Sequence, residues 1–281
     1  MLSRSSWLSI AWTIFAGSAW LGLAIAAPAP LTNFAQQNSD GTEVDVELAL
    51  AVDISFSMDP EEQELQREGY IHALTSREFL SALKQGIHGK VAITYFEWAN
   101  INERRVIVPW RLIDGPEAAD AFVAEIARAP YRRASRTSVS GALEFAAELF
   151  EKSPYKGIRR VIDVSGDGAN NNGPPVAIVR DEVLSKGFVI NGLPIMLKDP
   201  IGSGMDIDAL DIYYEDCVIG GPGAFVIPIK ERSKFKEATR TKLLQEIAAL
   251  PPEPRVLPAA TTAPRMSCMV GETIWQQRWG N

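Results

Sequence analysis

The feature that most constrains the fold is an apolar run, VDVELALAVD at residues 44–53, followed almost at once by signals for a helix start. The run alternates at first and then becomes continuously apolar, which is typical of a central strand covered by helices on both faces. Asp59 as N-cap, Pro60 at the first helical position and Glu62 three residues after the cap predict the helix start. A strand leading directly into a helix is the repeating unit of α/β folds.

Strands and helices continue to alternate along the next two hundred residues. Residues 90–99 and 104–113 are predicted as two strands joined by a short turn, and Pro109 places the second at a sheet edge. The other predicted elements are helices at 115–129, 139–153, 175–187 and 231–250, and strands at 159–168, 188–197 and 223–229. We therefore predict a doubly wound α/β sheet, mostly parallel with one antiparallel edge strand, with helices on both faces.

The first 26 residues have the composition of a secretory signal peptide. They carry one charged residue, Arg4, then an apolar stretch that ends in the small residues AIA at 24–26. An uncleaved membrane anchor is the alternative, because the apolar stretch is long for a signal peptide. Either segment places the rest of the chain outside the cytoplasm, in the periplasm or beyond the cell. We expect a linker at 27–44, a folded domain at 45–250 and a Pro-rich tail packed on that domain at 251–281.

The charge balance of the chain is acidic. The formal net charge is −7, and removal of a signal peptide containing Arg4 takes away one positive charge and leaves −8. An acidic protein is poorly suited to bind nucleic acid or an anionic membrane surface. We therefore expect no nucleic-acid binding and no binding to membrane lipid.

The two cysteines, Cys217 and Cys268, both lie in the part of the chain predicted to be exported. Because disulfides persist in oxidising compartments, we predict one bridge that ties the tail to the domain. Two buried free thiols are the alternative. We expect Trp275 to be a second contact between the tail and the domain.

Oxygen-bearing side chains gather where predicted strands end. Asp53, Ser55 and Ser57 follow the first strand, Thr137 precedes a helix, and Asp167 lies in a GDG turn that closes another strand. Ligands of open α/β sheets bind beyond the carboxyl ends of the strands, so we expect these side chains to meet there. Carboxylate and hydroxyl oxygens suit a hard divalent cation, Mg²⁺ above all. Helix capping is the alternative explanation for the serines and for Thr137.

The order of these motifs resembles a known metal site. D-x-S-x-S, then a threonine ahead of a helix, then an aspartate in a GDG turn is similar to the metal-ion-dependent adhesion site (MIDAS) of von Willebrand factor type A domains, such as integrin I domains. The resemblance covers about residues 45–250. The stretches AVDISFSMD, RRVIDVSGDG, INGLPI and YYEDCVIGGPGAF also resemble a group of exported bacterial proteins built on this domain, which brings no defined activity.

The resemblance implies a role for each of the five residues. Ser55 and Ser57 would bind the cation directly, and Asp53 and Asp167 would bind it directly or through water and balance its charge. Thr137 would bind in one ligand state and not in another. The cation, Mg²⁺ or alternatively Mn²⁺ or Ca²⁺, would keep one position open for an acidic side chain of a partner protein.

Other acidic residues carry weaker signals. Asp163 lies within a predicted strand, and we interpret it as hydrogen-bonded structure rather than as a ligand. Asp206, Asp208 and Asp211 lack the glycine and glutamate of a calcium loop, and we interpret them as the acidic start of a helix. Phe56, inside the D-x-S-x-S motif, is bulky enough to narrow access to the ion.

We expect a binding domain rather than an enzyme. The only histidines, His72 and His88, lie in or near the first helix and away from the predicted metal loops, which argues against a Ser-His-Asp hydrolase. The sequence contains no G-x-S-x-G, H-E-x-x-H or G-x-x-x-x-G-K motif. Two alternatives stay open: a Mg²⁺-dependent phosphohydrolase with Asp53 as nucleophile, and a domain whose metal is purely structural.

Overall fold

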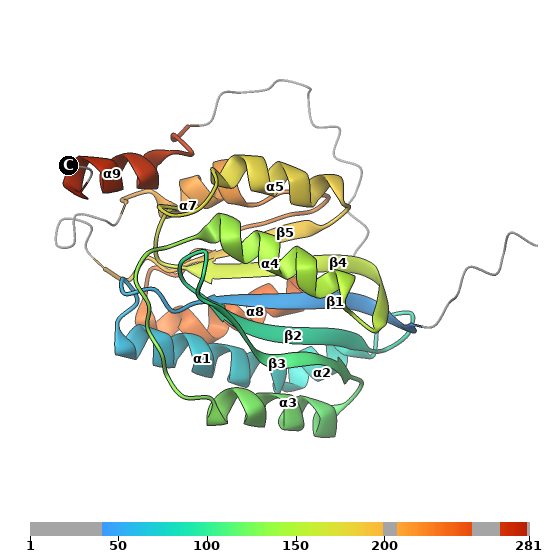
Figure 1. The fold of residues 1–281 in the computed structure, drawn as a ribbon. Helices are drawn as coiled ribbons and strands as arrows, with labels where there is room; N and C mark the ends of the chain where they lie inside the picture. The colour runs from blue at the N-terminus through green and yellow to red at the C-terminus, as the bar shows by residue number, and fades with distance from the viewer. Residues whose placement is uncertain (1–40, 199–206, 249–264, 280–281) are drawn as a thin grey trace, which may run out of the picture. The chain divides into compact units, whose positions relative to one another are not determined.

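A computed structural model describes residues 41–198, 207–248 and 265–279 (Figure 1). The predicted signal peptide, most of the linker and the first part of the tail lie outside the described residues. Within the described ranges, no helix combines the length and the apolar character that crossing a membrane requires.

The centre of the domain is a five-stranded sheet in the order β3-β2-β1-β4-β5. β1 pairs in parallel with β2 and β4, β4 pairs in parallel with β5, and β3 runs antiparallel to β2 at the edge. The strands are β1 (Thr42–Asp53), β2 (Val91–Trp98), β3 (Arg104–Ile113), β4 (Tyr155–Gly166) and β5 (Val189–Pro194). The predicted fold class is confirmed, including the antiparallel edge strand that carries Pro109.

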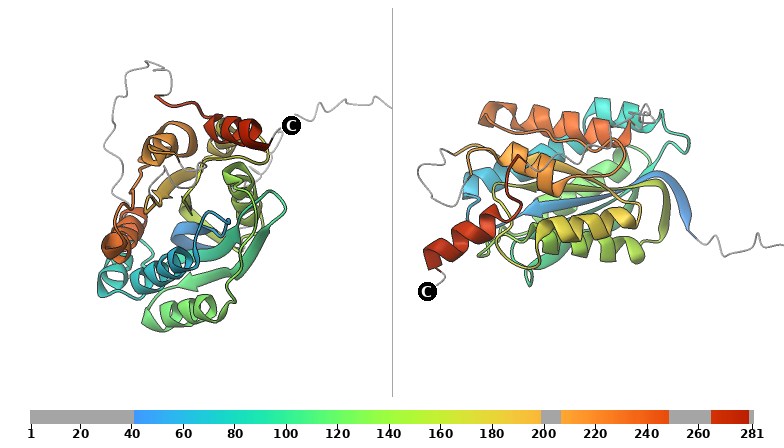
Figure 2. Two further views of the ribbon diagram at one scale, coloured as in Figure 1. Left: turned by 90° about the vertical axis from the view of Figure 1, so that its left-hand side faces the viewer. Right: turned by 90° about the horizontal axis from the view of Figure 1, so that it is seen from above.

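Helices cover both faces of the sheet, as the views in Figure 2 show. β1 is buried on both sides because its side chains alternate: Leu48 and Leu50 join one apolar cluster, and Ala49 and Ala51 join the other. The leucine face packs against α1 (Pro60–Leu74), α2 (Arg77–Leu83), α3 (Pro116–Arg128) and α8 (Phe235–Ile247). The alanine face packs against α4 (Val139–Glu151), α5 (Val176–Ser185), α7 (Leu210–Tyr213) and the π-helical turn Tyr214–Val218.

The helix start after β1 is the capping box that the sequence predicts. The Asp59 carboxylate accepts from the Glu62 backbone N–H at 2.8 Å, and the Glu62 carboxylate accepts from the Asp59 N–H at 2.8 Å. The first helix, α1, ends at Leu74, and Ser76 then caps a second helix by accepting from the Phe79 N–H. The chain between β1 and β2 therefore forms two helices, α1 and α2.

The predicted strand at residues 223–229 is wrong. This segment lies beside β5 but forms only isolated bridges, from Val226 to Gly192 and from Ile229 to Ile195. The Ile227 and Ile229 N–H groups donate to the Gly192 and Pro194 carbonyls at 3.0 and 2.9 Å, but Pro194 has no N–H to donate back between these two bonds. The segment also begins at Gly223 with a positive φ of 75°. The sheet consequently ends at β5 with an irregular strip of chain along its edge.

The C-terminal tail carries a helix, α9 (Val270–Trp279), that was not predicted from the sequence. The predicted disulfide between Cys217 and Cys268 is present and joins this tail to the π-helical turn. Of the acidic segment, Asp206 lies outside the described residues, Asp208 precedes α7, and Asp211 lies in its first turn. The predicted acidic start of a helix is therefore present for the two residues that the structure describes.

Candidate metal centre

The loop between β1 and α1 is held in place by neighbouring backbone. The Ile54 N–H donates to the Trp98 carbonyl at the end of β2 at 2.8 Å, and the Ala134 N–H donates to the Ile54 carbonyl at 3.0 Å. The Met58 N–H donates to the Ser55 carbonyl at 3.0 Å and closes a turn. These bonds bring the serines after β1 to the carboxyl end of the sheet, where the loop after β4 also begins.

Four of the five predicted ligands lie in one hydrogen-bonded chain. The Ser55 N–H donates to Asp53 Oδ1 at 2.6 Å, and the Ser55 and Ser57 hydroxyls lie 2.8 Å apart. The Ser57 hydroxyl then donates to Asp167 Oδ1 at 2.6 Å. The structure thus joins residues that are 110 positions apart in the sequence.

Thr137 lies beside this chain. Its N–H donates to the Asn171 side chain at 3.0 Å, and the Asn171 N–H donates back to the Thr137 carbonyl at 2.8 Å. A Cβ placed on Gly168 would lie 3.6 Å from Thr137 Oγ1 and 4.0 Å from Ser57 Oγ. Both hydroxyls therefore face the space above Gly168.

Both carboxylates of the site are buried. Asp53 is 0% exposed and Asp167 is 6% exposed. Burial, followed by the nearby charge of Asp167, raises the pKa of Asp53 well above its ordinary value. Burial likewise raises the pKa of Asp167 to about 6, although the ammonium of Lys198 opposes that change. A cation between the two carboxylates would stabilise their charged forms.

One oxygen of Asp53 is left without a hydrogen bond. Its Oδ2 atom is buried and has no partner among the described residues. A Cβ on Gly166 would lie 2.7 Å from this oxygen, so only a glycine at the end of β4 avoids a steric clash with the Asp53 carboxylate. A buried carboxylate oxygen without a partner, next to two hydroxyls and a second carboxylate, fits a hard divalent cation.

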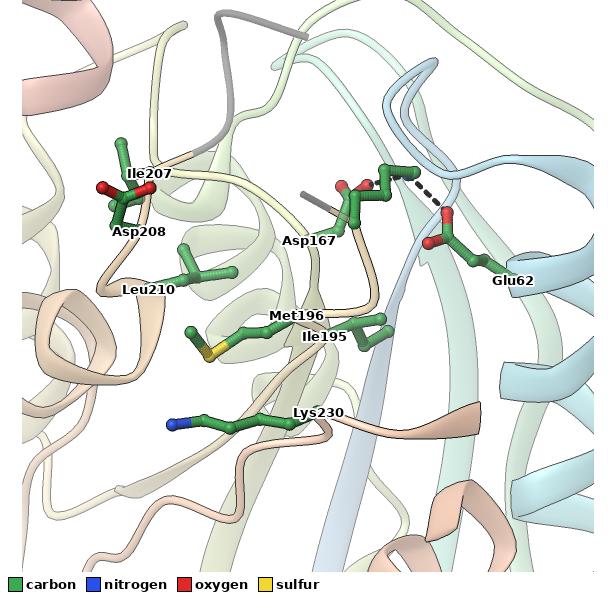
Figure 3. A pocket seen from close by; sticks show the side chains of 9 residues that line it. Glu62, Asp167, Ile195, Met196, Ile207, Asp208, Leu210 and Lys230 are labelled. Atoms are coloured by element: carbon green, nitrogen blue, oxygen red, sulfur yellow. Dashed lines mark hydrogen bonds and ion pairs between the residues drawn. The ribbon is translucent and has the colours of Figure 1, made fainter. Parts of the chain in front are cut away.

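Lys198 and Glu62 belong to the same site, although neither was predicted as a site residue from the sequence. The Lys198 ammonium lies 2.9 Å from Asp167 Oδ2 and also contacts the Glu62 carboxylate and the Ser57 carbonyl. Figure 3 labels Glu62 and Asp167, and its dashed lines mark these interactions. Glu62 showed only its capping role in the sequence, and Lys198 lies in no motif.

The charges of the site are unequal. The ammonium of Lys198 pairs with the buried carboxylates of Glu62 and Asp167, and Asp53 adds a third buried carboxylate, which leaves a formal charge of −2 when all are ionised. In the part of the chain that the structure describes, no three His, Cys, Asp or Glu side chains are grouped to hold a metal by themselves. A metal here would therefore need the hydroxyls of Ser55, Ser57 and Thr137 as well as the two aspartates.

A cavity of about 460 Å³ opens above the hydroxyls of the site. Ser55, Ser57 and Thr137 line its floor, and Phe56, which is 57% exposed, forms part of its wall. Trp275 of α9 is another part of that wall. The tail contact predicted for Trp275 therefore lies at the site itself.

Asp163 belongs to a separate buried network. Its Oδ1 lies 2.7 Å from the Lys242 ammonium and accepts from the Tyr70 hydroxyl at 3.2 Å. Lys242 also contacts Glu246 one turn later on α8, at 2.5 Å. The prediction that Asp163 is hydrogen-bonded structure is confirmed. Lys242 and Glu246 were not predicted to be buried, because nothing in the helix sequence separates them from exposed charges.

A family model covers most of the chain, including all five candidate ligands. The model of the family described as "Protein of unknown function (DUF1194)" matches residues 43–251. The chain belongs to this family. DUF1194 domains share the von Willebrand factor type A-like fold, so the resemblance seen in the sequence is confirmed. No curated protein sequence is similar enough to match the chain.

Solved structures similar to this DUF1194 chain share its fold at low identity. The proximal thread matrix protein 1 of the mussel byssus is 12% identical with a TM-score of 0.55, over 74% of this chain and 49% of that one. A second structure of the mussel protein, with a zinc-occupied MIDAS motif, has a TM-score of 0.50 at 12% identity, over 74% of this chain and 49% of that one. The pilus adhesin SpaC from Lactobacillus rhamnosus GG is 12% identical with a TM-score of 0.52, over 73% of this chain and 30% of that one. The chain therefore spans half or less of the relatives' own length.

Proposed function

We propose that this chain is an exported protein-binding module that holds a partner through a divalent cation. The cation would be bound by Asp53, Ser55, Ser57, Thr137 and Asp167. The observation that carries the proposal is the buried, unpartnered Oδ2 of Asp53 within a chain of hydroxyls that ends at Asp167. That arrangement is unfavourable without a cation and favourable with one.

The chemistry of the donors assigns a role to each residue. The Ser55, Ser57 and Thr137 hydroxyls supply neutral oxygen ligands, and Asp53 and Asp167 supply charge. A divalent ion would balance the formal charge of −2 that the buried groups leave. Mg²⁺ prefers such oxygen ligands, and Mn²⁺ and Ca²⁺ accept them too.

The open side of the site supports a binding role. The cavity above the hydroxyls is large enough to admit a side chain, and a carboxylate entering it would complete the coordination of the ion. Two of the similar structures point in the same direction, since one is a pilus adhesin and one carries zinc in its MIDAS motif. We propose an acidic side chain of a partner protein as the ligand.

The burial of Asp53 favours ligation over catalysis. A nucleophilic carboxylate must reach its substrate, whereas Asp53 is 0% exposed and its Oδ1 is bonded to the Ser55 N–H. We therefore rank a phosphohydrolase as the second candidate function.

The disulfide between Cys217 and Cys268 supports export to the periplasm or the cell exterior, where such bridges persist.

The proposal is tested with acetylated, amidated heptapeptides that differ only in a central Asp or Asn. The purified chain should bind the Asp peptide in Mg²⁺ and lose that binding in excess EDTA, and it should discriminate against the Asn peptide. Asp53→Ala should abolish the discrimination. Equal binding of both peptides, with or without the ion, would contradict a metal-dependent adhesion role. Turnover of a phosphate monoester in Mg²⁺ that Asp53→Ala removes would favour the hydrolase.

A further inference from the structure

We infer that α9 is the ligand-selecting wall of the metal centre, and that the partner presents its acidic side chain next to an aromatic or large aliphatic residue. This inference rests on the proposed function. It assigns the cavity beside the ion to the neighbour of the acidic residue. Its observations come from α9 and the loop before Thr137, which the metal proposal does not use.

α9 is fastened to the loop that carries Asp167. The disulfide of Cys268 fixes the chain just before the helix, and the Asn170 side chain donates to the Glu272 carboxylate at 2.8 Å. A Cβ on Gly271 would lie 2.1 Å from the Asn170 carbonyl oxygen, so the helix approaches this loop as closely as only a glycine allows. Figure 1 shows α9 at the end of the sheet where β1 and β4 finish.

The face that α9 turns toward the site is aromatic. The rings of Trp275 and Trp279 lie 4.4 Å apart, and both line the cavity above the hydroxyls. Trp279 is 51% exposed, and Phe56 lines the same cavity. A half-buried and an exposed tryptophan at one cavity are typical of a binding surface, because Trp contributes large contact area at low entropic cost.

A strained arginine joins this aromatic wall to the ion site. Arg136 precedes Thr137 and has a φ of 72°, in the left-handed region that residues other than glycine rarely adopt. Its guanidinium lies 3.3 Å from the centre of the Trp275 ring, and it donates to the Asn171 carbonyl at 3.3 Å. Its guanidinium thus places a positive charge against the ring of Trp275 at the cavity.

The charges and the shape of the cavity together select its occupant. Arg136 lines the cavity and the proposed cation would lie at its floor, so the cavity favours an anion although the whole chain is acidic. The tryptophans favour an apolar or aromatic group within reach of that anion. An acidic residue followed by a large apolar one meets both requirements.

The test uses acetylated, amidated heptapeptides with central Asp-Trp, Asp-Leu, Asp-Ala or Asn-Trp, titrated into the purified chain in Mg²⁺ and in EDTA. We expect Asp-Trp and Asp-Leu to bind about ten-fold more tightly than Asp-Ala. Trp275→Ala should reduce that preference to less than about two-fold while Asp is still distinguished from Asn, which shows that the variant is folded. Trp275→Phe should restore part of the preference. The control is Ile158→Ala, an exposed apolar residue near the start of β4 and away from the site, which should change nothing.

The outcomes separate the two proposals. If Asp and Asn peptides bind alike in Mg²⁺, the metal-dependent function is wrong and the inference is wrong with it. If Asp is preferred in Mg²⁺ but Asp-Trp, Asp-Leu and Asp-Ala bind equally, only the inference is overturned. It is also overturned if Trp275→Ala keeps the full ten-fold preference.

Discussion

Replacing Asp53 with asparagine should stabilise the protein in the absence of metal and destroy its response to metal. Asp53 is 0% exposed, its Oδ2 has no hydrogen-bond partner among the residues described, and the neighbouring charge of Asp167 disfavours its ionised form. Asparagine has nearly the same shape, keeps an oxygen for the Ser55 N–H and carries no charge. The substitution therefore removes a buried charge without removing the bond that shapes the loop.

The size of the effect follows from the buried charge, because the amide of asparagine still places a polar group where Oδ2 lies. A buried polar group without a hydrogen bond costs about 1–3 kcal/mol and a charged one costs more, so the gain is the excess that the charge adds. We expect Asp53→Asn to raise the free energy of unfolding in EDTA by about 1–3 kcal/mol. In Mg²⁺ at 100 times the dissociation constant, the wild type should gain about 2.7 kcal/mol and the variant nothing. The difference between the two proteins should therefore shrink or reverse when the ion is added.

The assay is urea denaturation of both proteins in EDTA and across a Mg²⁺ titration. The matched control is Asp45→Asn, at the other end of β1, where both carboxylate oxygens accept backbone N–H groups, from His88 at 2.9 Å and from Lys90 at 3.2 Å. That variant should lose about 1 kcal/mol in both conditions. An Asp53→Asn protein that is less stable than the wild type in EDTA would refute the reasoning.

Three further predictions concern the buried charges of α8 and the positive φ of Arg136. Burial, followed by the charge of Asp163, raises the pKa of Glu246 from 4.5 to about 8, so the stability that Glu246 contributes should be greatest below pH 4.5 and should be lost as the pH rises toward 8. Glu246→Gln should flatten this dependence by up to about 1.4 kcal/mol per pH unit, and an unchanged slope in urea denaturation would contradict it. Lys242→Met leaves the buried carboxylate of Asp163 without its cation and should cost about 3–5 kcal/mol, so a loss below about 1 kcal/mol would argue against the ion pair. Arg136→Gly should be more stable than Arg136→Ala by about 1 kcal/mol, because glycine adopts the positive φ without strain; equal denaturation midpoints would count against that strain.

The sheet could be predicted because its signals are local. The apolar run of β1, the capping box at Asp59 and Pro109 in the edge strand each report on a few neighbouring residues. The strand prediction for residues 223–229 was wrong because the apolar composition matches a strand, whereas the pairing with β5 is interrupted at Pro194. Position beside β5 depends on packing, which composition does not encode.

The site was predictable only in part. The spacing of Asp53, Ser55 and Ser57 placed them in one loop, and strand order brought Asp167 to the same end of the sheet. The contact of Lys198 with Asp167 and the stacking of Arg136 on Trp275 join segments that are 31 and more than a hundred residues apart. Neither pair lies in a motif, so only the folded structure shows that the candidate site has a basic and aromatic wall.

The most direct measurement is isothermal titration of Mg²⁺ and Mn²⁺ into the purified chain, beside the Ser55→Ala, Ser57→Ala double variant. Those hydroxyls are 2.8 Å apart and connect the two buried aspartates, so their loss removes ligands without adding charge. The account predicts one ion bound per molecule of the wild type and none bound by the double variant. If neither protein binds an ion, or if both bind it equally, the oxygen cluster is not a metal site and the proposed function is wrong.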